Sequence, residues 1–545
     1  MPTTPASTPP TPTASLPAET VLWESASVPA ETDELTASGL PHWLAAVLAR
    51  RGVADATAAE AFLEPSLDQL HDPRLLADLD AATERLRQAR DAGERVAIVG
   101  DYDVDGVSGT ALLTAVLRAC GLDVLPILPH RIRDGYGFQP VHAERAAAES
   151  CAVVVTVDCG TRSLDAIEVA RRAGIEVIVT DHHLPGPDRP EGVLLINPRR
   201  DDCTYPFDEL AGAGLAMKLA LAAAEACGRT LDPRQLVRMA CLGTVADLVP
   251  LVGENRVIAS IGLRELSRTR SVGLRALIEV SRVRPPLSAE DIGFRLGPRL
   301  NAPGRLDSAD AALELLLTRD PERASRLAAD LDARNRERRS WEQQVGDDAR
   351  ERFRALGTDL PAFLVAWDPT WHRGVVGIAA GRLAKEFNRP VVLLAIDGDR
   401  ATGSGRSAAG LHLHDFLDRW RDQLERFGGH AQAIGLTVGL DRLDTLRDEW
   451  EAAANAEWGD IVRVRRRTYE IDLAADEIGP EVFAALRRLE PFGQANPSPM
   501  VRVRGPLRLA RPPRLFGRGH LEAELVGAGR ARITVLGWGW TSRAD

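Results

Sequence analysis

Three aspartates in one short loop are the residues of this chain whose types and spacing point most directly to chemistry. Asp101, Asp103 and Asp105 alternate in the segment Gly100-Asp-Tyr-Asp-Val-Asp-Gly106. Oxygen-rich loops of this kind bind hard or borderline divalent cations. A calcium-binding EF-hand starts with similar spacing, but it needs Glu at position twelve and flanking helices. Position twelve here is Leu112, and a predicted strand precedes the loop, so we reject that alternative.

Two more segments with metal-ligand side chains follow predicted strands. Asp158 comes after the apolar run 152–157, and Asp181-His182-His183 begins where the run 175–180 ends. Taken alone, Asp158 could be an ordinary helix N-cap and His182 a structural histidine. In an open parallel sheet, however, ligands bind beyond the carboxyl ends of the strands. Three strand ends bearing such residues therefore predict one shared crevice.

Asp247, in Gly243-Thr-Val-Ala-Asp-Leu-Val-Pro250, adds a further carboxylate at a predicted helix end. A mixed Asp and His set favours Mn²⁺ or Mg²⁺ over calcium, because imidazole suits transition ions. The ligands suffice for two ions with one Asp bridging. Two neighbouring ions activate water and stabilise the attacking and leaving oxygens of an in-line phosphoryl displacement. Neither a Walker A pattern nor HExxH occurs, so hydrolysis of a phosphoester is the expected reaction.

Glycine-rich and polar loops elsewhere carry groups suited to holding phosphates. Backbone N–H groups beside glycine can approach an anion closely. Each loop alone is as well explained as a plain loop or helix cap. The predicted substrate-binding residues are Arg299, Asn301, Arg305, His372, Arg373, Ser404, Arg406, Ser407, Gly429 and His430.

The elements that must position these residues form a predicted α/β chain of several domains. Strands at 95–99, 124–128, 152–157, 175–180 and 193–196 alternate with helices at about 107–119 and 162–173, which predicts a parallel, doubly wound sheet. A second α/β lobe and a small C-terminal barrel follow a long, charged helix. The predicted boundaries are a disordered tail 1–36, an N-terminal helical segment 37–92, a phosphoesterase domain 93–315, a linking helix 316–357, a substrate-binding domain 358–460 and a small barrel 461–545.

Composition limits the classes of protein that fit. Hydrophobic residues make up 45% and charged residues 27% of the 545 residues, which is typical of a globular protein. We expect a cytoplasmic protein without a membrane partner, since no secretory signal or apolar membrane span is evident. The net charge of −11 argues against a polyanionic partner. Nucleic acid responds to local patches, however, and residues 501–545 carry nine Arg against Glu522, Glu524 and Asp545.

Together these segments resemble the DHH phosphoesterase family, and within it the bacterial exonucleases that degrade single strands. The resemblance covers about residues 40–540. It is carried by Asp101-Tyr-Asp-Val-Asp-Gly106, Val157-Asp-Cys-Gly160, Asp181-His-His183, Arg299-Leu-Asn-Ala-Pro-Gly-Arg305, Trp371-His-Arg-Gly374, Gly403-Ser-Gly-Arg-Ser407 and Gly428-Gly-His430. Several such segments in this order are highly specific, whereas any one would not be.

The resemblance implies a 5′→3′ exonuclease for single-stranded DNA that releases 5′-mononucleotides with two Mn²⁺ or Mg²⁺ ions, in DNA repair and recombination. The metal ligands that it implies are Asp103, Asp105, Asp158, His182 and Asp247, with Asp158 bridging. It gives Asp101 and His183 supporting or acid–base roles. It also implies two lobes, DHH and DHH-associated, joined by a long helix. Expected partners are single-stranded DNA, a single-strand-binding protein and a RecQ-type helicase, and the expected state is a monomer.

The C-terminal part of the resemblance implies an oligonucleotide-binding barrel that tracks single strands with basic and aromatic side chains. Candidate contacts are Arg502, Arg504, Arg514, Phe516 and Arg518. The chain ends at Asp545, soon after the apolar segment 532–537, so we expect a barrel that is incomplete or closed differently.

Two alternatives stay open from the sequence. One is a phosphodiesterase for short oligonucleotides or cyclic dinucleotides, or a pyrophosphatase, built on the same metal site. The other is a non-catalytic replication scaffold on the same fold. Degradation of long single strands would separate the first from an exonuclease, and an inert protein that still binds Mn²⁺ would favour the second.

Overall fold

The computed structural model describes residues 20–131, 133–306, 308–517, 519–527 and 532–540. The chain divides into two compact units, each of which is discontinuous in sequence. One unit comprises residues 1–24 and 337–468, and the other comprises residues 25–336 and 469–545. We call them the smaller and the larger unit.

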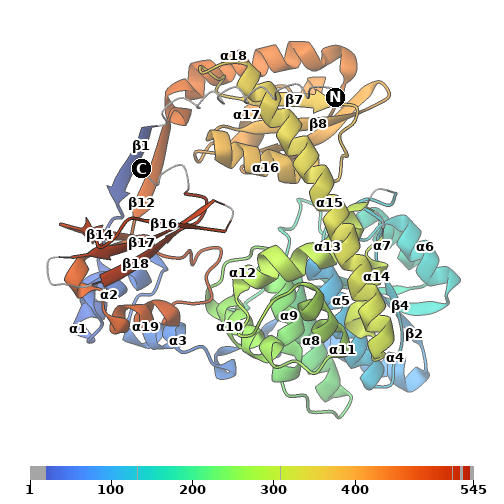
Figure 1. Cartoon of the computed structure of the whole chain (residues 1–545). Helices are drawn as coiled ribbons and strands as arrows, with labels where there is room; N and C mark the ends of the chain where they lie inside the picture. Colours follow the sequence, from blue (N-terminus) through green and yellow to red (C-terminus); the bar gives the residue numbers. More distant parts are fainter. Residues whose placement is uncertain (1–19, 132, 307, 518, 528–531, 541–545) are drawn as a thin grey trace, which may run out of the picture. The chain divides into compact units, whose positions relative to one another are not determined.

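The larger unit contains a five-stranded parallel sheet with the order β3-β2-β4-β5-β6. Its strands β2 and β4 are labelled in Figure 1. Its strands are β2 (Arg95–Gly100), β3 (Asp123–Ile127), β4 (Cys151–Val157), β5 (Glu176–Thr180) and β6 (Leu194–Ile196). The continuous apolar runs of β2 and β4 are buried on both faces, as strands covered by helices on two sides require. Strand order reverses between β2 and β4, which creates a switch point beside the loop after β2.

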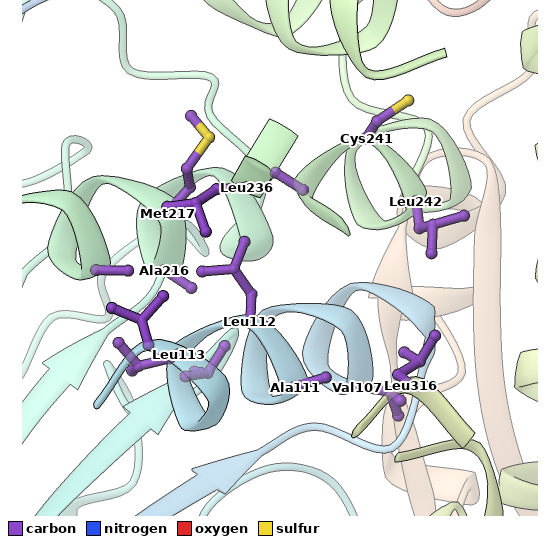
Figure 2. Packing of buried hydrophobic residues seen from close by; sticks show 14 of the residues in the cluster. Val107, Ala111, Leu112, Leu113, Ala216, Met217, Leu236, Cys241, Leu242 and Leu316 are labelled. Carbon is purple, nitrogen blue, oxygen red and sulfur yellow. The ribbon is translucent and has the colours of Figure 1, made fainter. Parts of the chain in front are cut away.

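Helices cover both faces of this sheet. Alternate residues of the strands pack against α5 (Val104–Ala119), α8 (Gly212–Ala226) and α9 (Arg234–Ala246) on one face. The intervening residues pack against α6 (Pro140–Ala148) and α7 (Leu164–Arg172) on the other. Figure 2 shows the Leu112 side chain pointing from α5 toward the helices that carry Met217 and Leu236. The predicted doubly wound α/β class is therefore confirmed.

Further helices complete the larger unit, and one of them, α10, is hydrogen-bonded to segments that are distant in the sequence. They are α4 (Leu79–Ala92), α10 (Gly253–Ser267), α11 (Val272–Val280), α12 (Ala289–Asp291), α13 (Gly297–Leu306) and α14 (Asp310–Leu317). Arg256 of α10 is 2% exposed and donates hydrogen bonds of 2.7–2.9 Å to the carbonyl oxygens of Phe62, Arg488, Leu489 and Glu490. The guanidinium thus connects N-terminal, central and C-terminal parts of the chain.

The N-terminal helices share a hydrophobic core with residues more than 400 positions later. Leu44, Leu48 and Phe62 pack with Ile471 and Leu489. This core lies between α1 (Glu31–Ala37), α2 (His42–Arg50), α3 (Ala56–Leu63), β13 (Ile471–Ala474), α19 (Pro480–Arg488) and β14 (Val501–Arg504). The segment predicted as a separate N-terminal domain therefore obtains much of its core from the C-terminal part.

The predicted disordered tail is wrong for residues 20–36. Strand β1 (Thr20–Ser25) pairs with β12 (Val464–Tyr469), and helix α1 follows with Leu35 fully buried. Composition suggested disorder because few apolar residues occur there. The apolar ones that do occur, such as Val21, Leu22 and Trp23, form a strand whose partner is remote in sequence. Residues 1–19 of that prediction lie outside the described residues.

The C-terminal strands form an open sheet. Strands β15 (Arg508–Leu509), β16 (Arg514–Phe516) and β18 (Arg532–Gly537) all pair with β17 (His520–Val526), and β13 pairs separately with β14. Within the described residues no ladder of hydrogen bonds joins the two groups of strands. The expected barrel is thus not closed, because its strands are divided between two separate ladders.

The smaller unit has a five-stranded sheet with the order β10-β11-β9-β8-β7. Its strands are β7 (Leu364–Asp368), β8 (Val391–Asp397), β9 (Arg400–Arg406), β10 (Arg426–His430) and β11 (Ala433–Gly439). The helices α16 (Val376–Phe387), α17 (Leu413–Asp418) and α18 (Leu443–Val462) accompany it, and α15 (Pro321–Ala355) runs from the larger unit into it. Among the described residues, no helix is both long and apolar enough to cross a membrane.

Candidate metal centre

The ends of three parallel strands and one helix bring seven predicted residues together in the larger unit. The three aspartates follow β2, Asp158 follows β4, the two histidines follow β5, and Asp247 caps the C-terminus of α9. The Nε2 atom of His182 lies 3.1 Å from Asp158 Oδ1, 3.6 Å from Asp247 Oδ2 and 4.0 Å from Asp105 Oδ2. The three groups with ligand atoms within 4.8 Å of one another are Asp158, His182 and His183; Asp105, His182 and Asp247; and Asp101, Asp103 and Asp158.

Asp105 is held by the N-terminus of α8. Its Oδ2 accepts the backbone N–H of Gly212 at 2.7 Å, and its Oδ1 accepts that of Ala213 at 2.8 Å. Unpaired N–H groups and the helix dipole both favour a carboxylate at this position. Glycine is required here, since a Cβ on Gly212 would lie 2.5 Å from Asp158 Cβ. The small residues thus let helix and carboxylates approach closely.

The other aspartates are fixed by backbone geometry. Asp103 is the N-cap of α5 and accepts the N–H groups of Asp105 and Gly106 at 2.9 and 3.1 Å. Asp101 accepts the N–H of Gly137 at 3.3 Å. Asp158 has a φ of +63°, a left-handed conformation that is uncommon for residues other than glycine. Such local strain is typical of functional sites, and here it directs the carboxylate into the cluster.

The two histidines have different partners. Asp181 Oδ1 contacts His183 Nδ1 at 2.7 Å and also accepts the N–H of His182 at 2.8 Å. The Tyr136 hydroxyl lies 3.1 Å from Nε2 of His183 and donates to the carbonyl oxygen of Asp158 at 3.4 Å. Asn197 donates to the His183 carbonyl oxygen at 2.9 Å. His183 is therefore positioned by neighbours, whereas His182 directs Nε2 toward the carboxylates.

The electrostatics of the cluster show that its charges lack compensation. Burial and the neighbouring Asp103 raise the pKa of Asp101 to about 8 and that of Asp247 to about 7. Burial and neighbouring carboxylates also raise the pKa values of Asp105 and Asp158 well above their usual range. Buried acids that repel one another in this way need a cation to remain ionised.

The donor atoms fit divalent ions. Asp158 Oδ1 and His182 Nε2 are buried and have no hydrogen-bond partner among the described residues. Burial lowers the pKa of His182 to about 4, so its imidazole is neutral at physiological pH. Neutral imidazole and carboxylate oxygens are the ligands that Mn²⁺ and Mg²⁺ accept. The pair of unpartnered atoms thus has the chemistry of a metal site.

The predicted residues of α13 lie close to this loop. A Cβ on Gly304 would be 2.8 Å from the carbonyl oxygen of Tyr102, so the helix packs directly against the aspartate loop. Arg299 contacts Asp332 at 2.8 Å. The Oδ1 atom of Asn301 is buried without a hydrogen-bond partner in the described part of the chain, and Arg305 lies half-buried near the helix end. Asn301 therefore offers an acceptor near the cluster.

In the smaller unit, the structure groups some of the remaining predicted residues. Ala433 of β11 is opposite both Arg406 of β9 and His430 of β10. A Cβ on Gly377, at the start of α16, would lie 3.1 Å from the Arg406 guanidinium and from Ser404 Oγ. Arg406, Ser404 and the N-terminus of α16 are thus neighbours, which is an arrangement suited to an anion.

The other predicted residues of this unit have more local roles. Ser407 Oγ donates to the Leu411 carbonyl oxygen at 2.6 Å. The His372 ring packs on Trp341 with 4.4 Å between ring centroids, and Arg373 is exposed in the turn before α16. Gly429 has a φ of +140°, and a Cβ there would lie 2.3 Å from the Ala433 carbonyl oxygen. Gly429 is thus needed for the close approach of β10 to β11.

The arginines of the C-terminal strands are mostly paired with acids. Arg502 and Arg504 both contact Asp472, and Arg514 contacts Glu522 at 2.8 Å. Phe516 packs against His520 and Trp538. Arg518 lies outside the described residues. The local excess of arginine seen in the sequence is thus partly neutralised by ion pairs.

Sequence reasoning missed several residues that build the site. They are Tyr136, Asn197, Gly212 and Ala213. Two local patterns could have indicated them. Asp134-Gly-Tyr-Gly-Phe138 places an aromatic residue between glycines, and Gly212-Ala-Gly214 starts a helix with small residues only. Asn197 has no comparable signal, because its role depends on the packing of β6 beside β5.

Family models match three parts of the chain. Residues 95–244 match the DHH family N-terminal domain, residues 360–456 match the DHHA1 domain, and residues 469–545 match the RecJ OB domain. The open C-terminal sheet therefore belongs to an oligonucleotide-binding domain.

Curated relatives and solved structures agree with these matches. The chain is 41% identical over 514 residues to the single-stranded-DNA-specific exonuclease RecJ of Dickeya dadantii, covering 90% of this chain and 88% of the relative. It is 38% identical over 519 residues to the protein of the same name from Escherichia coli, with coverage of 90% and 88%. The crystal structure of RecJ in complex with Mn²⁺ from Thermus thermophilus superposes with a TM-score of 0.79 at 32% identity, covering 95% of this chain and 74% of that one.

Proposed function

Because this chain belongs to the RecJ family of single-stranded-DNA-specific exonucleases, we propose that it degrades single-stranded DNA from the 5′ end and releases 5′-mononucleotides. The observation that carries the proposal is the group of buried acids around His182 Nε2, which needs divalent cations to stay ionised. DNA repair and recombination are the processes that require such resection.

We assign Asp103, Asp105, Asp158, His182 and Asp247 as the residues that would hold the ions, with Asp158 as the shared ligand. Asp158 and His182 are each present in two of the three close groups. Of the two, only the carboxylate has two oxygens with which to bind two ions, which favours Asp158 as the shared ligand. Bound divalent ions would supply Lewis-acid activation of water and stabilisation of charge on the phosphoryl oxygens. The backbone N–H groups of Gly212 and Ala213 keep Asp105 oriented for this purpose.

Asp101 and His183 take supporting roles in this proposal. Burial lowers the pKa of His183, but the hydrogen bond to Asp181 and the charge of Asp181 outweigh it, so the net shift is upward. A protonated His183 can donate a hydrogen bond toward a phosphate oxygen or a leaving oxygen. Tyr136 holds the ring in place.

We propose that the smaller unit binds the 5′ phosphate. Arg406 and Ser404 beside the N-terminus of α16 combine a guanidinium, a hydroxyl and helix N–H groups, which together favour a phosphate dianion. His430, across β11 from Arg406, can add a further donor. His372, Arg373, Ser407 and Gly429 shape the surrounding turns, and Arg299, Asn301 and Arg305 of α13 would contact the strand near the ions.

The test is a metal-dependent nuclease assay on long single strands with the 5′ or the 3′ end blocked, with duplex as a further substrate. We expect release of mononucleotides from 3′-blocked single strands, and no activity on 5′-blocked strands or blunt duplex. Activity confined to dinucleotides would instead make the chain an oligonucleotide phosphodiesterase. Equal activity on both blocked strands would contradict the assigned polarity.

Partners and cellular context extend the proposal. A cytoplasmic monomer that acts on single strands would work with a single-strand-binding protein and a RecQ-type helicase, which together supply and protect its substrate. Sedimentation of the purified chain tests the monomer. Stimulation of degradation on helicase-opened duplex tests the partnership, and no stimulation would contradict it.

A further inference from the structure

A cavity on the larger unit lies away from the metal centre and is lined by arginines. Its volume is about 790 Å³. The arginines that line it are Arg118, Arg229, Arg238, Arg270 and Arg319, and none of the described residues that line it is acidic. Leu112, Val116, Leu236 and Leu316, all largely buried, contribute an apolar floor, and three of these four are labelled in Figure 2.

The positive charge of this cavity is uncompensated. None of the five guanidinium groups forms an ion pair with another described residue; Arg118 donates only to the Val124 carbonyl oxygen, at 2.9 Å. Surface arginines elsewhere in the same unit, such as Arg87 and Arg171, pair with neighbouring glutamates. In a chain with a net charge of −11, five unpaired arginines around one cavity indicate an anionic ligand.

The cavity lies near the amino ends of the strands of the parallel sheet, whereas the metal centre lies at their carboxyl ends. Helix α5 begins at the aspartate loop, and Arg118 and Cys120 at its other end line the cavity. A helix of 16 residues is about 24 Å long. The contact of Arg118 with Val124 places the cavity where β3 starts, whereas the metal centre lies where strands end. A ligand here would therefore leave the reacting phosphate untouched.

The lining distinguishes between kinds of anion. Sites for single-stranded nucleic acid stack bases on aromatic rings, whereas the lining of this cavity contains no aromatic side chain from the part of the chain that the structure describes. The arginines come from five separate segments of the chain, so they are not gathered at one helix terminus or turn as in a phosphate loop. Aliphatic side chains beneath spaced guanidinium groups instead match a peptide with several carboxylates and an apolar anchor.

We propose that this arginine-lined cavity docks an acidic segment of a partner protein and places one of its apolar side chains over Leu112 and Leu236. The site would tether the enzyme to another protein. The metal centre at the carboxyl ends of the β-strands would remain free for DNA. This inference does not depend on the polarity or products of the nuclease.

The test uses the full chain and a short fluorescein-labelled peptide of Asp and Glu residues around a Leu-Leu pair, followed by fluorescence anisotropy. We expect binding that weakens at least about tenfold in Arg238→Glu with Arg319→Glu, since charge reversal at a charge-complementary interface places like charges opposite one another. A peptide with Asn and Gln in place of the acids should not bind. A peptide with Ala for Leu should bind about tenfold more weakly.

The matched control is Arg264→Glu with Arg268→Glu, which makes the same charge change at the C-terminal end of α10, outside this cavity. The control should bind the peptide like the wild type, and both doubly substituted proteins should keep wild-type melting temperatures and hydrolysis of short oligomers. Equal loss of peptide binding in both pairs, or equal binding of the neutral peptide, would overturn the proposal. Displacement of the peptide by oligothymidylate would also overturn it and make this face a DNA surface.

Discussion

The metal centre and the C-terminal sheet differ in how far their charged side chains are neutralised by neighbouring side chains. In the centre, Asp105 and Asp158 are buried beside other carboxylates, and among the described residues no ion pair joins either of them to an arginine or a lysine. In the sheet, exposed arginines face acids on neighbouring strands, as Arg514 faces Glu522 and Arg532 faces Glu524. The first region must obtain its cations from solution, whereas the second has neutralised much of its own charge. The same chain thus keeps one site unsatisfied and one surface nearly balanced.

This difference assigns catalysis to the metal centre and DNA binding to the C-terminal sheet. A buried acidic cluster is costly without ions, so its presence indicates a functional site. Exposed ion pairs contribute only about 0–1 kcal/mol each, so DNA phosphates can compete for those arginines at little cost. The metal centre is therefore the region that a single substitution should abolish, and the sheet is the region that substitutions should only adjust.

The largest effect is expected from Asp158→Asn. Hydrolysis should fall at least about a thousandfold, because the variant lacks the ligand that we propose the two ions share, and with it several kcal/mol of stabilisation. Without metal, the variant should melt no lower than the wild type, since the substitution removes a repelled buried acid. Initial rates on single strands and thermal melts in EDTA measure both. Asp165→Asn, at an exposed position of α7, is the control, and substantial activity in Asp158→Asn would exclude Asp158 as a ligand.

The next effect is stabilisation by Mn²⁺. An ion present at a hundredfold excess over its Kd should stabilise the wild type by about 2.7 kcal/mol, since it binds only the folded state. Asp158→Asn should lose most of this gain, and Asp165→Asn should keep it. Unfolding curves with and without Mn²⁺ provide the measurement. An equal gain in all three proteins would place the bound ion elsewhere.

The pH dependence of the metal-free protein follows from Asp101 and Asp247. Their folded pKa values of about 8 and about 7 exceed the unfolded values of roughly 4, so the folded state binds more protons between those limits. The free energy of unfolding in EDTA should therefore decrease as pH rises from about 5 to about 8. Saturating Mn²⁺ should remove this decrease. Denaturant titrations across that range test it, and a rise with pH in EDTA would contradict it.

The smallest effect is expected in the sheet. Glu522→Gln with Glu524→Gln should free Arg511, Arg514 and Arg532 and tighten binding of long single strands severalfold at low salt. The dependence of log K on log salt should become steeper by about 0.7 for each new phosphate contact. Glu168→Gln with Glu322→Gln removes the same charge from ion pairs on α7 and α15 and should change neither quantity. Fluorescence anisotropy titrations at several salt concentrations measure both quantities. Unchanged binding of single strands by the Glu522→Gln, Glu524→Gln variant would mean that DNA does not contact these arginines.

The sequence was most informative where metal-ligand side chains directly follow an apolar run that predicts a strand. Continuous apolar runs located β2, β4 and β5, and their carboxyl ends located Asp101, Asp158 and His182. Partners that depend on tertiary packing could not be foreseen. The N–H groups that hold Asp105 belong to a helix 107 and 108 positions away. The ion pairs that neutralise the C-terminal arginines likewise required the register of β16 and β18 on β17.

The shared core of the first helices and the C-terminal segment has a consequence for synthesis on the ribosome. Leu44 and Leu48 cannot be covered by Leu489 until roughly 400 further residues have been made, which takes about 20–80 s at bacterial translation rates. During that interval the nascent chain exposes an apolar face while the parallel sheet behind it can already fold. A chaperone that binds emerging apolar segments would find its target there, and release would coincide with the arrival of α19.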